Sequence, residues 1–144
     1  MKSSPAPAVH ILLVDDNPDG LIVRRNLLEE QGYQVQIACN GQEGLDLFGS
    51  VCFDVVVTDF RMPVMSGIDL IRGIRALKPL TPVILLSGMV EPLGLTDVST
   101  GADAVIPKNS NEPANLMRWV KRLLNRASRK PAASQRSILA RARA

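Results

Sequence analysis

Five short stretches along the chain have the pattern of strands. Continuous apolar runs occupy residues 11–14, 55–57, 83–86 and 104–106. Runs that are apolar on both faces are typical of central strands in a parallel sheet. Residues 34–37 (Gln-Val-Gln-Ile) alternate between polar and apolar instead. That alternation indicates an edge strand with one face in water.

Helical patterns separate these stretches. Asn17 and Pro18 fit the N-cap and first position of a helix that ends near Gly32. Further helices are expected over 41–50, from 66 to 77 and over 116–124, whereas Pro92 and Gly94 favour only a short or poorly ordered helix over 90–100. The apolar faces are expected to hold Leu21, Ile22, Leu27, Leu28, Leu45, Phe48, Leu70, Ile71, Ile74, Leu77, Leu116, Trp119, Val120, Leu123 and Leu124.

The strand-then-helix alternation occurs five times. It predicts an α/β fold, a doubly wound (βα)5 unit with a parallel five-stranded sheet, right-handed crossovers and helices on both faces. The polar edge character of the second strand favours the strand order 2-1-3-4-5, the flavodoxin-like arrangement.

Composition and charge refine this outline. The chain has 144 residues, of which 46% are hydrophobic, and a net charge of +3. Residues 1–127 carry 12 basic and 14 acidic side chains, whereas residues 128–144 carry five basic ones and no acid. We therefore expect a flexible N-terminus over 1–8, one compact domain over 9–127 and a flexible basic tail over 128–144. No apolar run is long enough for a membrane span and the first residues do not form a signal peptide, so a cytoplasmic location is expected.

Cysteine and histidine are too scarce for several kinds of site. Cys39, Cys52 and His10 are the only such residues in the sequence. They cannot supply a Cys/His zinc site, and a Ser–His–Asp or Cys–His catalyst would depend on His10, which lies in an apolar run.

Polar side chains follow the predicted strands at their carboxyl ends. Asp15 and Asp16 follow the first strand, and Asp59, Ser87 and Lys108 follow the third, fourth and fifth. Ligands of such sheets bind beside these ends. Carboxylates held together need a cation, and their oxygens suit Mg²⁺. The set predicts a metal-assisted phosphoryl site with Asp59 as nucleophile.

The chain resembles the receiver domain of bacterial two-component response regulators. The similarity extends over about residues 9–127. Each matching motif is weak alone, but together they occur in the family's order, each at the end of a strand. They are residues 12–17 (LLVDDN), 54–59 (DVVVTD), 61–63 (RMP), 65–67 (MSG), 85–88 (LLSG), 101–104 (GADA) and 107–108 (PK).

The resemblance implies a signalling role, with no enzyme activity beyond the protein's own phosphorylation and dephosphorylation. Asp59 is then the phosphoacceptor, Ser87 the switch hydroxyl and Lys108 the lysine that pairs with the phosphoryl group. The donor is a phosphohistidine of a sensor histidine kinase or a phosphotransfer protein. Phosphorylation would change the protein-interaction surface around the fourth helix, fifth strand and fifth helix, through which copies could also pair as a homodimer.

The resemblance also implies a Mg²⁺ site. Its ligands would be Asp15, Asp16 and Asp59, together with the backbone carbonyl of Arg61. The side chain of Arg61 stands two positions after the acceptor. We expect it to influence how long a phosphoryl group remains on Asp59.

Two positions depart from the family's usual pattern. Val105 stands where an aromatic residue often takes part in the switch. Asn109 follows Lys108 where the family usually has a proline in cis linkage, so either a costly cis bond is retained or the loop differs. Both departures point to an altered partner surface.

Several alternatives remain open on the sequence alone. Only 17 residues follow Ala127, so we expect a stand-alone receiver, or else a receiver taken from a longer chain. It could instead be a phosphorelay intermediate or a pseudo-receiver that acts as an interaction module. A flavodoxin-type cofactor protein is disfavoured because residues 15–18 (Asp-Asp-Asn-Pro) would repel an anion. Direct DNA binding through the basic end is the weakest interpretation, since the segment lacks interleaved aromatic residues. The sequence does not name a downstream target.

Overall fold

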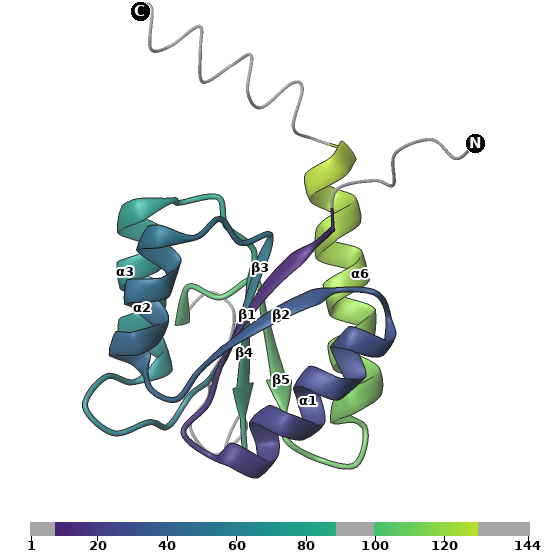
Figure 1. The fold of residues 1–144 in the computed structure, drawn as a ribbon, viewed down its shortest axis with the longest axis horizontal. Coiled ribbons are helices and arrows are strands. Elements are labelled where there is room, and N and C mark those ends of the chain that lie inside the picture. Colours follow the sequence, from purple (N-terminus) through teal and green to yellow (C-terminus); the bar gives the residue numbers. More distant parts are fainter. Residues whose placement is uncertain (1–7, 89–99, 130–144) are drawn as a thin grey trace, which may run out of the picture.

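The computed structural model describes residues 8–88 and 100–129. It shows a five-stranded parallel sheet in the order β2-β1-β3-β4-β5, which confirms the predicted topology (Figure 1). The strands are β1 (His10–Val14), β2 (Gln34–Ala38), β3 (Val55–Asp59), β4 (Val83–Ser87) and β5 (Ala104–Pro107). The helices in the described part are α1 (Pro18–Glu30), α2 (Gly41–Ser50), α3 (Gly67–Leu77) and α6 (Glu112–Arg129).

Some expectations fall outside the described residues. These are residues 90–99 of the helix expected over 90–100, residues 1–7 of the N-terminus expected to be flexible over 1–8, and residues 130–144 of the basic tail expected over 128–144. The fourth-helix part of the expected interaction surface belongs with them. Among the described helices none is long and apolar enough to cross a membrane.

The sheet separates two hydrophobic layers. Helices α1 and α6 cover one face, and α2 and α3 cover the other (Figure 1). Successive residues of β1 alternate between them, since Ile11 and Leu13 pack in the first layer and Leu12 and Val14 in the second. Both faces of the central strands are therefore buried, as the continuous apolar runs predicted.

The buried faces of the helices include fewer residues than the apolar pattern predicted. Leu21 and Leu28 of α1 are buried, but Ile22 is 49% exposed, and Arg24 occupies the buried face instead. Leu77, expected in the core, is 54% exposed because it is the last residue of α3. Four further residues of the expected apolar faces are only partly buried, namely Leu27, Leu45, Trp119 and Leu124.

The register of the sheet brings the ends of the strands together. Val14 pairs with Thr58, Asp59 with Leu86, and Ser87 with Pro107. Parallel strands all point the same way, so the residues that follow them lie at one edge of the sheet. The candidate polar side chains are brought together by this register.

Candidate functional site

Three carboxylates meet at the ends of β1 and β3. Asp15, Asp16 and Asp59 each place a carboxylate oxygen within 4.8 Å of the others. Asp15 is 1% exposed and Asp59 is 6% exposed, whereas Asp16 is open to solvent. The backbone N–H of Asp15 donates to the carbonyl of Ala38, which fixes this residue beside β2. Asp15 and Asp59 are thus held by the sheet, whereas Asp16 faces solvent.

Asp15 is further held by the start of α1. Its Oδ1 accepts a hydrogen bond of 3.0 Å from the backbone N–H of Asn17. Asn17 is the N-cap of α1, and its own side chain accepts from the backbone N–H of Asp19. The helix cap predicted from the sequence therefore also orients a candidate ligand.

Lys108 supplies a positive charge to Asp59. Its Nζ lies 2.5 Å from Asp59 Oδ1, and the lysine side chain is 30% exposed. The backbone N–H of Lys108 donates to the carbonyl of Ser87 at 2.9 Å. The residue after β5 is therefore tied both to the end of β4 and to the carboxylate at the end of β3.

The surroundings of Asp59 shift its proton affinity. Burial raises the pKa of Asp59 above its usual value, whereas the hydrogen bond and charge of Lys108 oppose the rise. The negative charge of Asp15 raises the pKa further, and the backbone N–H of Phe60 lowers it. The net rise in pKa means that ionisation of Asp59 is less favourable here than for a carboxyl group in water.

Ser87 and Arg61 lie beside this carboxylate. Together with Asp59, Phe60, Gly88 and Lys108 they line a hollow of about 180 Å³. Ser87 is buried at 2% exposure, at the end of β4, whereas Arg61 is exposed. The predicted switch hydroxyl and the residue two positions after the acceptor therefore border the same small space.

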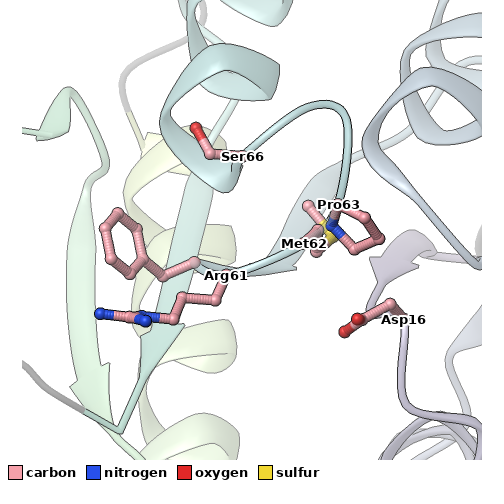
Figure 2. A pocket seen from close by; sticks show the side chains of 6 residues that line it. Asp16, Arg61, Met62, Pro63 and Ser66 are labelled. Carbon is pink, nitrogen blue, oxygen red and sulfur yellow. The ribbon is translucent and has the colours of Figure 1, made fainter.

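A larger hollow of about 570 Å³ opens on the Asp16 side. It is lined by Asp16, Phe60, Arg61, Met62, Pro63 and Ser66. Figure 2 shows the guanidinium of Arg61 directed away from Asp16, with Met62 and Pro63 between Asp16 and the start of α3. The Asp16 side of the site is thus open and partly apolar.

The loop between β3 and α3 is tightly constrained. The backbone N–H of Met65 donates to the carbonyl of Pro63, and Val64 between them has φ 71°. Gly67 begins α3 directly against the Asp59 backbone, where an added Cβ would overlap the Asp59 carbonyl oxygen and come within 2.8 Å of Leu85 Cδ1. This explains the glycine in the motif 65–67, because only a residue without Cβ lets α3 start so close to the acceptor.

The structure also shows two charged residues that the sequence analysis missed. Arg24 of α1 donates from Nη1 to Asp15 Oδ2 at 2.7 Å. It also donates to both carboxylate oxygens of Glu112, from Nε at 3.1 Å and from Nη2 at 2.8 Å. Arg24 lies three residues after Leu21 and four before Leu28, so its place on the apolar face was a signal that could have revealed it.

This ion cluster is buried. Arg24 is 9% exposed and Glu112 is 7% exposed. Burial alone would lower the pKa of Arg24, but the hydrogen bonds and charges of Glu112 and Asp15 outweigh it and leave the pKa above its ordinary value. The arginine is therefore a permanent cation between Asp15 and Glu112.

The two departures from the family pattern lie on β5 and after it. Val105 is partly buried and packs against the layer of α2 and α3. Asn109 donates its backbone N–H to the carbonyl of Pro107, and its side chain accepts from the backbone N–H of Asn111. The described peptide bonds are all trans, the one after Lys108 included, so the loop differs from a cis-proline loop.

The donor set fits a hard divalent cation. Three carboxylates lie within reach of one another, and one of them is exposed. Mg²⁺ binds through one or two carboxylates and keeps several waters, which an open site allows. Asp15, Asp16 and Asp59 are the described acids that could hold it.

Comparisons with known proteins agree with this geometry. The model of the response regulator receiver domain matches residues 11–121. The sensor protein ArcB of Escherichia coli, which controls aerobic respiration, is 33% identical over 113 residues, 76% of this chain but 14% of ArcB. The chain spans no more than half the length of the curated relatives it matches here.

Solved structures agree in fold as well as in sequence. A CheY-like receiver domain protein of Methanospirillum hungatei is 30% identical, with a TM-score of 0.78 over 85% of this chain and 98% of that one. The response regulator TrrA of Thermotoga maritima, solved with Mg²⁺-BeF, is 33% identical, with a TM-score of 0.73 over 80% and 98%. The chain therefore belongs to the response regulator receiver domain family of two-component systems.

Proposed function

We propose that this receiver accepts a phosphoryl group on Asp59 from a phosphohistidine of a sensor kinase or phosphotransfer protein. The observation that carries the proposal is the placement of Asp59. Its carboxylate has oxygens of two other acids within 4.8 Å and the ammonium of Lys108 at 2.5 Å. A carboxylate with a cation site and a lysine around it is suited to phosphoryl transfer, which depends on positioning and charge stabilisation.

In the proposed step an oxygen of Asp59 forms a bond to phosphorus while the bond from phosphorus to the donor's imidazole nitrogen breaks. The electron pair of the broken bond stays on the imidazole, which takes a proton from solvent. The product is an acyl phosphate on Asp59. Mg²⁺, when bound, supplies positive charge to the oxygens of the transferred group.

The residues around Asp59 have separate tasks in this proposal. Asp15 and Asp16 hold the cation together with Asp59, and the backbone carbonyl of Arg61 is the further ligand expected from the family. Lys108 pairs with the phosphoryl oxygens once the charge moves outward from Asp59, and Ser87 donates its hydroxyl to one of them. Because Lys108 and Ser87 are joined through their backbones, both would respond to the same new charge.

That response is the proposed signal. A phosphoryl group adds charge at the strand ends and shifts the population of conformations of the surface formed by β5 and α6. The output is then a change in protein contact, either with a downstream protein or with the next member of a phosphorelay.

Intact-mass spectrometry after incubation with Mg²⁺ and a small phosphodonor such as phosphoramidate tests the proposal. We expect a gain of one phosphoryl group that is absent in Asp59→Asn. Asp54→Asn is the matched control, because Asp54 is an exposed acid next to β3 and accepts a hydrogen bond from the backbone N–H of His10. No gain in the unaltered protein, or an undiminished gain in Asp59→Asn, would contradict the proposal.

A further inference from the structure

The ion pair of Arg24 and Glu112 lies outside the cluster of three carboxylates, but it holds one of them, Asp15. Glu112 at the start of α6 binds Arg24 through two hydrogen bonds, and Arg24 binds Asp15 Oδ2 through a third. All three residues are at least nine-tenths buried. A planar guanidinium that is fixed at both ends cannot rotate away from either partner without losing hydrogen bonds.

Both oxygens of Asp15 are therefore oriented. Oδ2 accepts from Arg24 and Oδ1 accepts from the backbone N–H of Asn17. Neither donor belongs to the acids or to Lys108, so Asp15 is oriented from outside the cation site. Partners that hold a metal ligand in this way commonly affect metal affinity strongly.

We propose that Arg24 is a positioning residue of the cation site, which holds the Asp15 carboxylate in place and is itself held by Glu112. This inference rests on the proposed function, because it takes a divalent cation as the occupant of the site. It adds a link between that site and α6 that the three acids do not supply.

Gly20 supports the same assignment. A Cβ on Gly20 would lie 2.8 Å from Arg24 Nη1 and 3.0 Å from Asp15 Oδ2. The absence of a side chain at this helical position therefore leaves room for the contact between arginine and aspartate. Arg24 could not simply move aside for a Cβ, because Glu112 holds the other edge of its guanidinium.

Two alternatives to positioning give different results. As a mere counter-charge Arg24 would repel the cation, so its removal would strengthen Mg²⁺ binding. As a purely structural residue it would change stability but leave the Mg²⁺ affinity of the folded protein unchanged. If Arg24 is a positioning residue, its removal weakens Mg²⁺ binding, although the loss of its positive charge alone would strengthen it. The sign of the change separates the three roles.

The test is a calorimetric titration of the full chain with Mg²⁺ alone, without phosphodonor. Arg24→Met leaves two buried acids without a partner and could fail to fold. The main variant is therefore the double change Arg24→Met/Glu112→Leu, which removes the pair without altering net charge. The second variant is Gly20→Ala, which keeps every charge and introduces the Cβ. Arg25→Met is the matched control, since Arg25 is the neighbouring arginine of α1.

We expect both variants to bind Mg²⁺ about tenfold more weakly than the unaltered protein. Arg25→Met should bind Mg²⁺ with the same affinity as the unaltered protein. Folding is checked by far-ultraviolet circular dichroism before each titration. Unchanged or tighter binding by the folded double variant and by Gly20→Ala would overturn the inference, as would an unaltered protein that binds no Mg²⁺. Phosphorylation of Asp59 is measured separately by mass, so failure of the inference is distinguishable from failure of the proposed function.

Discussion

Val64 should carry backbone strain that a substitution can release. Its φ of 71° lies in the left-handed region, and the hydrogen bond from Met65 to Pro63 closes a three-residue turn around it. A residue held in so sparsely populated a conformation costs about 1–3 kcal/mol. Its branched side chain makes this position especially unfavourable.

The gain in the free energy of unfolding on replacing Val64 with glycine is the strain released minus the conformational entropy that glycine adds to the unfolded chain. The side chain is 99% exposed, so its removal sacrifices almost no buried area. Glycine relieves the strain but adds about 0.5–1 kcal/mol of conformational freedom to the unfolded chain. The net expectation is a rise of about 1 kcal/mol in the free energy of unfolding, or about 3–5 °C in Tm for a chain of this size.

Urea unfolding followed by circular dichroism measures this difference. The midpoint of Val64→Gly should rise with an unchanged dependence on urea. Val64→Thr is the matched control, because threonine keeps the branch at Cβ and should leave the stability unchanged. If Val64 is not strained, glycine changes only the entropy of the unfolded chain. A decrease of about 0.5–1 kcal/mol in the free energy of unfolding of Val64→Gly would therefore refute the reasoning.

Three further outcomes concern the acceptor and its surroundings. Gly67→Ala should lose about 2 kcal/mol of unfolding free energy in thermal denaturation, because the new Cβ overlaps the Asp59 backbone; helix propensity alone predicts a gain instead. Asp59→Asn should be more stable than the unaltered protein at neutral pH in metal-free buffer. The raised pKa of Asp59 means that the fold loses stability as this group ionises, so the advantage should vanish at a pH below the usual value of 3.8; an advantage that persists in acid would contradict this. Arg61→Ala should speed the loss of the phosphoryl group about threefold, or about 0.7 kcal/mol in the barrier, and an unchanged decay in a mass time course would exclude a role for Arg61.

The topology and the strand ends could be predicted because each rests on local pattern. A strand that is buried on both faces needs an uninterrupted apolar run, and the polar residue that follows it marks the edge of the sheet. Asp15, Asp16, Asp59, Ser87 and Lys108 are all brought to that edge by the predicted strand order. Their separate roles stay predictions until phosphorylation and Mg²⁺ binding are measured.

The contacts of α1 and α3 could not be predicted in the same way. Helical period defines a broad apolar arc, but the width of the buried face depends on what the helix packs against. Ile22 lies at the margin of that arc and faces solvent, whereas Arg24 is buried. Its burial is compensated by Glu112, which is 88 positions away in the sequence. The place of Arg24 on the apolar face can be read from the sequence, but a partner that distant cannot, so only the folded chain shows why the buried charge is tolerated.

The division of the core into two layers has a consequence for partial unfolding. The strands separate the side chains packed under α1 and α6 from those packed under α2 and α3. The helices on one face can therefore unfold locally without exposing the hydrophobic core on the other face. Native-state hydrogen exchange should then show separate opening free energies for α3 and α6, with the amides of β1 and β3 protected most strongly. A binding partner that remodels the side of α2 and α3 would leave in place the contacts of Arg24 and Glu112 that hold Asp15 on the other side of the sheet.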